Sequence, residues 1–264
     1  MKAILGLVIL VGGSVAAHAG AIDLTTLTLN GSATLASSNL QLTNTFAQVG
    51  SAYIPSPLLF DPSTGFTSSF QWTASNLSGL QPGGDGFAFV IQNDPNGSHA
   101  LGNAGGDLGF DGITGPALAV GFDIFGNFCG AALQICFSRP DGSTSGNVAA
   151  NPSLGNFQGD PVTRFGWVDY DANATLLSVF YSSTAEKPLV PITSLTVSLS
   201  QLLNGQAFFG FSGATGGATV TTDIQAFELN TSTTNAPEPG SMLMLAGGLA
   251  MLAALGLRAI RRSN

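Results

Sequence analysis

The chain has 264 residues, a formal net charge of −8 and only 8% charged side chains. Between Gly20 and Asn235 it carries three basic side chains against fourteen acidic ones. Nucleic acids and anionic lipid surfaces need clustered Lys and Arg, so we expect neither as a partner of this part of the chain. Its length suffices for one domain with a substantial core.

The N-terminus has the pattern of a secretory signal peptide, which we place at residues 1–19. Lys2 precedes an apolar run from Ala3 to Ala17, and Ala17-His18-Ala19 is a small-residue cleavage site. A membrane anchor is the alternative, but the run is short for a helix that spans a bilayer. We therefore expect an exported protein.

The middle of the chain is dominated by alternating apolar and polar residues, with many β-branched and aromatic side chains and few helical periodicities. Turn residues such as Gln81-Pro82-Gly83-Gly84 separate these runs. The pattern predicts strands at 24–29, 33–42, 65–72, 86–92, 117–125, 164–170, 176–181, 195–199, 207–212 and 219–229, and it is compatible with a short helix at 199–203. Many strands without crossover helices indicate an all-β fold, an antiparallel β-sandwich or jelly roll.

Two acidic side chains interrupt apolar, strand-like runs. Asp85 lies in the run 84–90 and Asp123 in the run 121–127. Burying a carboxylate without partners is costly, so each position needs hydrogen-bond donors, a cation or a polar ligand. Two such positions beside one apolar wall predict a binding site.

Cys129 and Cys136 are the only cysteines of the chain. Export permits a disulfide, and this spacing suits one that closes a hairpin or loop. We expect the disulfide, with two free buried thiols as the alternative.

The order of motifs along the chain resembles the legume-type (L-type) lectin domain. The motifs are GDGFAF at 84–89, AGGDLGF at 104–110, LAVGFD at 118–123, WVDYD at 167–171, LLSVFY at 176–181 and FFGFSGATG at 208–216. This resemblance implies a concanavalin-A-like lectin fold over residues 20–229 and a carbohydrate-binding function.

The resemblance also implies a role for each residue of a sugar site. Asp85 would accept hydrogen bonds from two adjacent hydroxyls, and it would follow a cis peptide bond after Gly84. Gly106 would bring a backbone N–H close to the sugar, Asn127 would donate its amide N–H, and Phe125 would stack on the pyranose. The alternatives are a turn-stabilising Asp, a tight Gly turn and a plain core Phe.

A calcium site is implied only in part. Its ligands would be Asp123, the carbonyl of Phe125, Asn127 and an Asp at a position where this chain has Gly130. Oxygen ligands suit calcium, which takes six to eight of them, and Asp141 could supply another. Calcium is therefore an open cofactor.

The second metal that the resemblance implies lacks its ligands. A Glu of that transition-metal site is replaced by Gly121, and no His follows His99. We hypothesise that a Cys129–Cys136 disulfide braces this loop in place of the metal.

The C-terminus resembles the bacterial PEP-CTERM sorting signal. A polar linker at 230–236 leads to a tail at 237–264, which contains Pro237-Glu238-Pro239, a predicted transmembrane helix at 242–260 and the basic residues Arg258, Arg261 and Arg262. The resemblance implies passage through the inner membrane and transient membrane attachment through the tail. Cleavage by a sorting protease and delivery to the cell surface or the exterior would follow; a plain anchor helix is the alternative.

The expected function is non-enzymatic binding of a glycan or exopolysaccharide. A structural surface or matrix protein with the same fold and no sugar binding is the alternative. A jelly-roll glycoside hydrolase is disfavoured because Glu186 and Glu228 do not form the closely spaced pair that such enzymes need. Nucleophilic catalysis is disfavoured as well, since His99 has no candidate partners around it.

Overall fold

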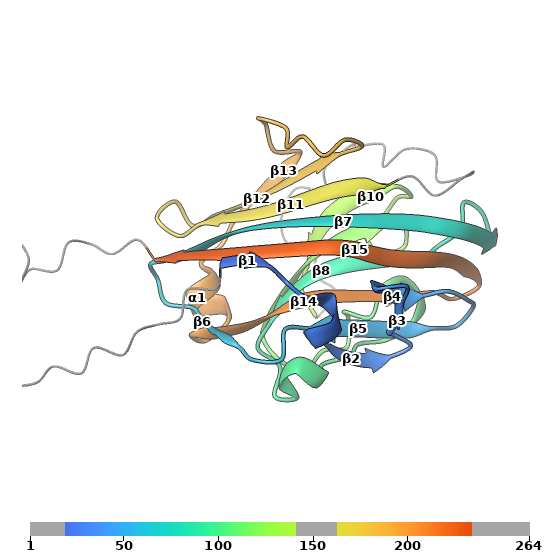
Figure 1. Cartoon of the computed structure of the whole chain (residues 1–264), viewed down its shortest axis with the longest axis horizontal. Helices are drawn as coiled ribbons and strands as arrows, with labels where there is room; N and C mark the ends of the chain where they lie inside the picture. Colours follow the sequence, from blue (N-terminus) through green and yellow to red (C-terminus); the bar gives the residue numbers. More distant parts are fainter. Residues whose placement is uncertain (1–18, 141–162, 234–264) are drawn as a thin grey trace, which may run out of the picture. The chain divides into compact units, whose positions relative to one another are not determined.

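The computed structural model describes residues 19–140 and 163–233 as two antiparallel β-sheets packed face to face (Figure 1). By its internal contacts the chain divides into a unit that ends at Ser232 and a unit that begins at Thr233, and only Thr233 of the latter is described. The signal peptide up to residue 18, the linker residues 234–236 and the whole sorting tail lie outside the described residues. The linker residues 230–233 are described, and they belong to the strand β15 (Ala218–Thr233) rather than to a linker. Within the described ranges, no helix has the length and apolarity needed to cross a membrane.

The larger sheet has eight strands. Their order is β13 (Thr193–Thr196), β12 (Leu176–Ser182), β11 (Arg164–Asp171), β7 (Thr64–Gly79), β15 (Ala218–Thr233), β4 (Asn39–Thr43) and β3 (Thr34–Ala36), with β1 (Ala19–Ala21) paired to β15. The 16-residue strands β7 and β15 run side by side through the sheet (Figure 1).

The smaller sheet has seven strands and carries the connections that form the site. Their order is β10 (Gln134–Ser138), β9 (Ala117–Asp123), β8 (Gly86–Gln92), β14 (Gln206–Ala214), β5 (Val49–Tyr53) and β2 (Thr28–Gly31), with β6 (Leu58–Leu59) paired to β14. Short helical turns lie in the connections: η1 (Leu24–Thr26), η2 (Gly97–His99), η3 (Gly105–Asp107) and α1 (Leu199–Leu202). The prediction of an all-β antiparallel sandwich is confirmed.

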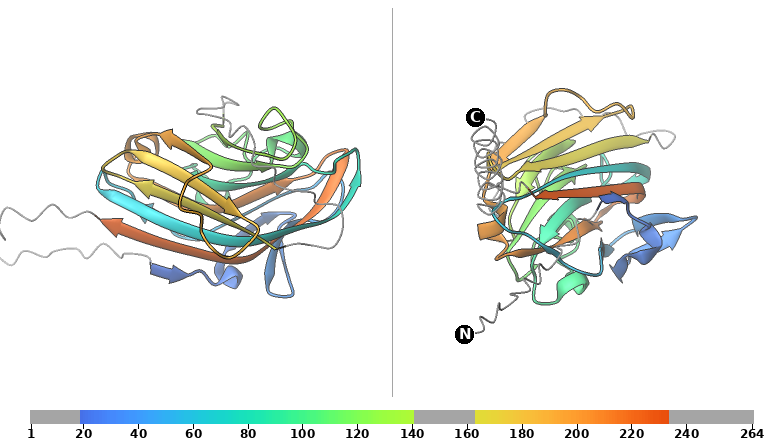
Figure 2. Two further views of the ribbon diagram at one scale, coloured as in Figure 1. Left: turned by 90° about the horizontal axis from the view of Figure 1, so that it is seen from above. Right: turned by 60° about the vertical axis from the view of Figure 1, so that its left-hand side comes forward.

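Figure 2 shows the two sheets from two further directions. Aromatic side chains from both sheets fill the space between them. Phe70 on β7 stacks on Phe89 of β8, with ring centroids 5.7 Å apart, and Phe87 stacks on Phe122 of β9 at 4.7 Å. Alternation along each strand sends every second side chain inward. The regular spacing of phenylalanines in these strands therefore becomes one continuous core.

Some strand predictions are wrong in their limits. The single strand expected at 33–42 is two strands, because Ser37 and Ser38 form a turn with positive φ angles of 52° and 70°. The segment 24–29 begins as the turn η1. Besides the short β1 and β6, the five-residue strands β5 and β10 were not predicted. Unlike the similarly buried β8, they show neither alternation nor a long apolar run.

Candidate functional site

Three neighbouring strands of the smaller sheet end at the same place. Gly86, the first residue of β8, pairs with Asp123 at the end of β9 and with Ala214 at the end of β14. Asp85 directly precedes β8, so it lies beside the loops that follow β9 and β14. The antiparallel register thus gathers three segments that are far apart in the sequence.

The main chain of Asp85 is bonded to both of these loops. Its N–H donates to the carbonyl of Ala214 at 3.1 Å, and its carbonyl accepts from the N–H groups of Ile124 and Phe125 at 2.9 and 3.1 Å. The peptide bond between Gly84 and Asp85 is cis, as the resemblance implied. The main chain therefore fixes the position from which the Asp85 carboxyl group extends.

The Asp85 carboxyl group is buried and only half satisfied. The residue is 4% exposed, and its Oδ1 accepts a hydrogen bond from Nδ2 of Asn127 at 3.1 Å. Its Oδ2 is buried and accepts no hydrogen bond from the described residues, since the nearby N–H of Gly216 donates to the carbonyl of Ala218 at 3.2 Å. Burial raises the pKa of Asp85 above 3.8, although the Asn127 amide and the Gly216 N–H act in the opposite direction. A buried acceptor without a donor is costly, and a donor from a ligand would remove that cost.

Glycines allow the surrounding loops to approach Asp85 closely. A Cβ at Gly106, in η3, would lie 2.4 Å from Nδ2 of Asn127. A Cβ at Gly216, in the connection between β14 and β15, would lie 3.2 Å from Oδ2 of Asp85. A larger residue at Gly106 would displace the Asn127 amide that bonds Asp85. The structure therefore brings the predicted residues Asp85, Gly106 and Asn127 together.

Phe125 and Asn127 stand at the open side of this group. Phe125 is partly exposed and lies outside the buried core, while Asn127 is exposed. A Cβ at Gly84 would lie 2.7 Å from the Cβ of Phe125, so the aromatic residue rests on the segment that leads into Asp85. An accessible ring beside a buried acceptor can contact the apolar face of a ligand while Asp85 accepts its hydroxyls.

Asp123 differs from Asp85 because its carboxylate is satisfied. It is fully buried, and its Oδ1 accepts the N–H of Gly126 at 2.7 Å. Its Oδ2 accepts the N–H groups of Phe128 and Cys129 at 2.8 and 2.6 Å. Burial is the largest influence on its pKa and raises it, against these three hydrogen bonds. Asp123 thus anchors the loop that carries Phe125 and Asn127.

A disulfide closes the same loop. Cys129 bonds to Cys136 with a Cα–Cα distance of 5.6 Å, and Cys136 lies on β10 opposite Gly121 of β9. A Cβ at Gly121 would lie 2.4 Å from Cε1 of Phe128, so the Phe128 ring occupies the space beside this glycine. Phe128 and both cysteines belong to a small second apolar cluster. The loop between β9 and β10 is consequently held by a carboxylate, a covalent bond and apolar packing.

The fold and these contacts define a lectin-type β-sandwich. Among solved structures, a lectin from Bauhinia forficata in complex with GalNAc superposes with a TM-score of 0.66 at 21% identity, over 80% of this chain and 95% of that chain. Lectin I-B4 from Griffonia simplicifolia in its metal-free form gives a TM-score of 0.64 at 22% identity, over 79% and 94% of the two chains. These likenesses show the fold.

The family follows from the sequence. The family model of the legume lectin domain matches residues 22–243, so the chain belongs to the legume lectin domain family. It is similar to L-type lectin-domain containing receptor kinase VIII.2 of Arabidopsis thaliana, with 32% identity over 221 residues. It is also similar to the probable L-type lectin-domain containing receptor kinase S.7 of the same plant, with 30% identity over 210 residues. These matches cover 76% and 69% of this chain but only 30% and 29% of the relatives.

The residues near Asp123 do not fit the pair of metals that the resemblance implies. A cation at Asp123 would have to compete with the three N–H donors that its oxygens already accept. The Phe128 ring fills the space beside Gly121, and Gly130 offers no side chain. In the described ranges, no three or more His, Cys, Asp or Glu side chains gather in a way that could hold a metal. The described residues therefore do not fit the two metals, and Asp141, the further calcium ligand suggested by the sequence, lies outside them.

Several contributors to the site were not found from the sequence. Gly216 was named only as the last residue of the motif FFGFSGATG at 208–216, and the N–H donors of Gly126 and Cys129 were not expected at all. Main-chain donors have no sequence signature, because every residue except proline carries one. The packing of Phe128 against Gly121 could be suspected only from the missing side chain at that glycine.

We expect Asp85→Asn and Asp123→Asn to change stability in opposite directions. The raised pKa of Asp85 means that the folded protein binds more protons than the unfolded chain just above pH 3.8, so this group lowers stability as pH rises through that window. Asp85→Asn should therefore raise the free energy of unfolding at pH 7, with a gain that disappears below pH 3.8. The pKa of Asp123 is raised as well, but both of its oxygens accept N–H groups. Asp123→Asn should therefore lower the free energy of unfolding by about 1–3 kcal/mol, because its amide NH2 would face N–H donors. Urea unfolding at pH 7 and pH 3 measures both; the reverse order would contradict the two assignments.

We expect the thermal midpoint to depend on the disulfide and not on a metal. Addition of EDTA should leave the midpoint unchanged, since N–H groups satisfy Asp123. Replacement of both Cys129 and Cys136 by Ser should lower stability by roughly 2.5 kcal/mol, the chain-entropy value for so short a loop. Differential scanning calorimetry with and without EDTA checks both expectations. A clear loss of stability in EDTA, reversed by calcium, would show that a metal does hold this loop.

Proposed function

We propose that this protein is an exported lectin that binds a glycan or exopolysaccharide at Asp85, Gly106, Phe125 and Asn127. The observation that carries the proposal is the buried Oδ2 of Asp85, which accepts no hydrogen bond from the described residues although it lies beside the accessible Asn127 amide. A vicinal pair of sugar hydroxyls supplies the donors that this carboxylate lacks.

Each residue would make a different contact with the sugar. Asp85 accepts from the hydroxyls, and Asn127 donates with the N–H that it does not use on Asp85. Gly106 leaves room for the backbone of η3 to approach, and the ring of Phe125 covers an apolar face of the pyranose. The GalNAc in the Bauhinia forficata complex, and the methyl-α-D-galactose in a complex of winged bean acidic lectin, support a pyranose as the ligand class.

We infer binding rather than catalysis. The two carboxylates closest in sequence on one strand are already engaged, because Asp169 pairs with Lys187 and Asp171 accepts N–H groups in the turn after β11. Neither is arranged as the acid or the nucleophile of a glycosidase. The chain spans less than a third of the receptor-kinase relatives that it matches, so their kinase activity is not attributed to it.

We expect site variants to lose glycan binding while keeping the fold. On a glycan array, Asp85→Asn and Gly216→Ala should each bind about 10- to 100-fold more weakly than the wild type. Asp85→Asn removes the charged acceptor, and the new methyl group of Gly216→Ala would block it. Losing a hydrogen bond to a charged group costs about 1.5–3 kcal/mol. Glu186→Gln, an exposed carboxylate on the connection between β12 and β13, is the control and should bind normally. Wild-type binding should also weaken as pH falls through the raised pKa of Asp85, since a protonated acid is a poorer acceptor. Equal binding by the wild type and both variants would reject this site, and binding by none of them would favour the structural matrix protein.

We also propose that the C-terminal tail directs the protein to the bacterial cell surface or the exopolysaccharide matrix. The support is the tripartite pattern at 237–264, which a sorting protease would recognise and cleave after the tail has entered the membrane. Mass spectrometry of protein recovered from the cell surface is expected to show an N-terminus at Gly20 and a C-terminus before residue 242. Surface protein that still ends at Asn264 would contradict the proposed cleavage.

A further inference from the structure

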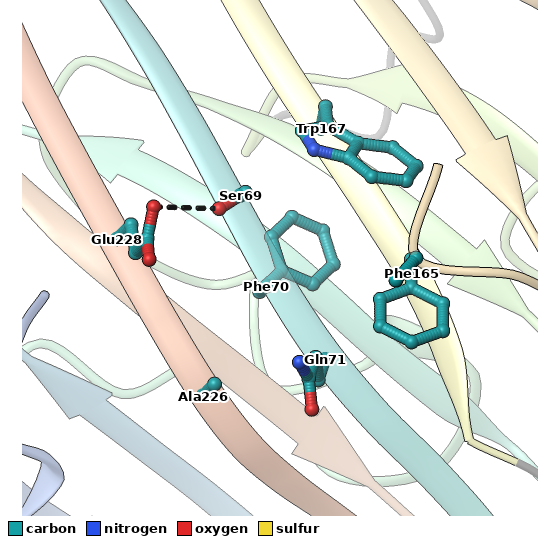
Figure 3. Close-up of a pocket in the computed structure, with 8 residues that line it drawn as sticks. Ser69, Phe70, Gln71, Phe165, Trp167, Ala226 and Glu228 are labelled. Atoms are coloured by element: carbon teal, nitrogen blue, oxygen red, sulfur yellow. Dashed lines mark hydrogen bonds between the residues drawn. The ribbon is translucent and has the colours of Figure 1, made fainter. Parts of the chain in front are cut away.

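A second polar and aromatic pocket lies on the outer face of the larger sheet, away from Asp85 (Figure 3). Its volume is about 130 Å³, and its walls come from β7, β11, β15 and the connection between β12 and β13. The lining side chains include Ser69, Gln71, Phe165, Trp167, Ala185 and Glu228.

Strand alternation places these side chains outside the core. On β11 the buried residues Gly166 and Val168 alternate with Phe165 and Trp167, which are both partly exposed. On β7, Ser69 and Gln71 are likewise the partly exposed members of the alternation. A fold that needed only a core would place small polar residues at these positions.

The pocket combines ring faces with hydrogen-bonding groups. The rings of Phe165 and Trp167 lie 6.3 Å apart with an interplanar angle of 21°, so they present nearly parallel faces. Across the strand pair, Trp167 is opposite Ser69 and Phe165 is opposite Gln71. Glu228 on β15 lies beyond Ser69 and accepts its hydroxyl at 3.4 Å (Figure 3). The polar groups thus form one edge of an aromatic surface.

The chemistry of these groups fits a saccharide. A sugar ring has an apolar C–H face that can lie on an aromatic ring, and hydroxyls at its edge that both donate and accept. Glu228 offers acceptors, Gln71 offers both kinds of group, and the long contact at 3.4 Å leaves the Glu228 carboxylate available for shorter hydrogen bonds. The acidic body of the protein disfavours an anionic ligand. The expected ligand is a neutral saccharide.

The shape of the pocket disfavours a second copy of the chain as its occupant. Ala185, on the connection between β12 and β13, contributes to the pocket wall, so this face is hollowed rather than flat. Leu189 and Val190 on the same connection are 99% and 74% exposed and would obstruct close packing of two sheets. The connection between β12 and β13 would obstruct the sheet of a second copy, but a narrow ligand can still enter the pocket.

We propose that this pocket is a second saccharide-binding site, independent of Asp85, which binds a segment of a neutral polysaccharide through Phe165 and Trp167. If the first site also binds glycans, as proposed above, one domain would hold two polysaccharide segments. Two such sites would join neighbouring chains of a matrix, and the second binding event would gain from the effective concentration set by the first.

The test measures binding of dextran, laminarin and galactomannan to the full chain that carries Asp85→Asn, so that the first site does not contribute. Affinity electrophoresis gives the dissociation constant, and tryptophan fluorescence gives a local signal, because the other tryptophan, Trp72, is fully buried. We expect at least one polysaccharide to retard this variant and to change its emission. Adding Trp167→Ala or Glu228→Gln should weaken binding at least tenfold, whereas Leu59→Ala, at an exposed apolar position on β6, should not.

The outcomes separate this site from the first one. If Asp85→Asn alone abolishes binding of all three polysaccharides, or if neither Trp167→Ala nor Glu228→Gln weakens it, the second site is rejected. Should Trp167→Ala prevent folding, the exposed Glu228→Gln variant still decides the question. Light scattering completes the test, since a change from dimer to monomer in Trp167→Ala would show that this face joins two copies instead.

Discussion

The buried carboxylate of Asp123 is the interaction on which the arrangement of the site depends. Its two oxygens accept three backbone N–H groups from the loop between β9 and β10. These bonds turn the chain sharply after β9, so that Phe125 and Asn127 face the segment around Asp85. Without them, Asp123 would be a desolvated charge with no partners, and the loop would have unsatisfied donors. The disulfide between Cys129 and Cys136 secures the far side of the same turn.

Asp123 and Asp85 differ in how fully their carboxylate oxygens are hydrogen-bonded. Both are buried and both have raised pKa values, yet the oxygens of Asp123 are engaged, while Oδ2 of Asp85 accepts nothing from the described residues. Asp85 also contributes to the raised pKa of Asp123, so the two negative charges are close enough to interact unfavourably. A protein selected for stability alone would have replaced the less satisfied of the two. In the proposed site, the hydroxyls of a ligand would complete the hydrogen bonds of Asp85.

Much of the fold can be predicted from the sequence, because alternation and turn residues mark most strands. The range 86–92 is predicted with the limits that β8 has in the structure, and the strands at 164–170 and 176–181 differ from β11 and β12 by one residue. The short β10, in which four of five residues are buried, gave no such signal. For the site, motif order placed Asp85, Gly106 and Asn127 in the right neighbourhood. The backbone donors to Asp123 and the packing of Phe128 against Gly121 depend on a loop conformation that no periodicity encodes.

The pocket on the outer face of the larger sheet was not predicted from the sequence either, and the reason differs from that for the backbone donors to Asp123. Phe165 and Trp167 fit a strand pattern, and an aromatic residue in a strand is ordinarily assigned to the core. The burial pattern of β11 shows that these rings point outward. The sheet order, in which β7 lies between β11 and β15, brings them near Ser69, Gln71 and Glu228.

The disulfide in the β9–β10 loop also determines in which compartment the loop takes its final form. A disulfide forms and persists outside the reducing cytosol, so in the proposed exported protein the loop that carries Phe125 and Asn127 becomes cross-linked only after export. The fixed cross-link does not depend on the supply of a cation, and it restricts the unfolded chain rather than adding a ligand-dependent contact. Asp123 nevertheless remains necessary, because a disulfide at Cys129 leaves the N–H groups of Gly126 and Phe128 without acceptors. The disulfide and the Asp123 carboxylate therefore hold different parts of one loop, and the position of Asn127 beside Asp85 requires both.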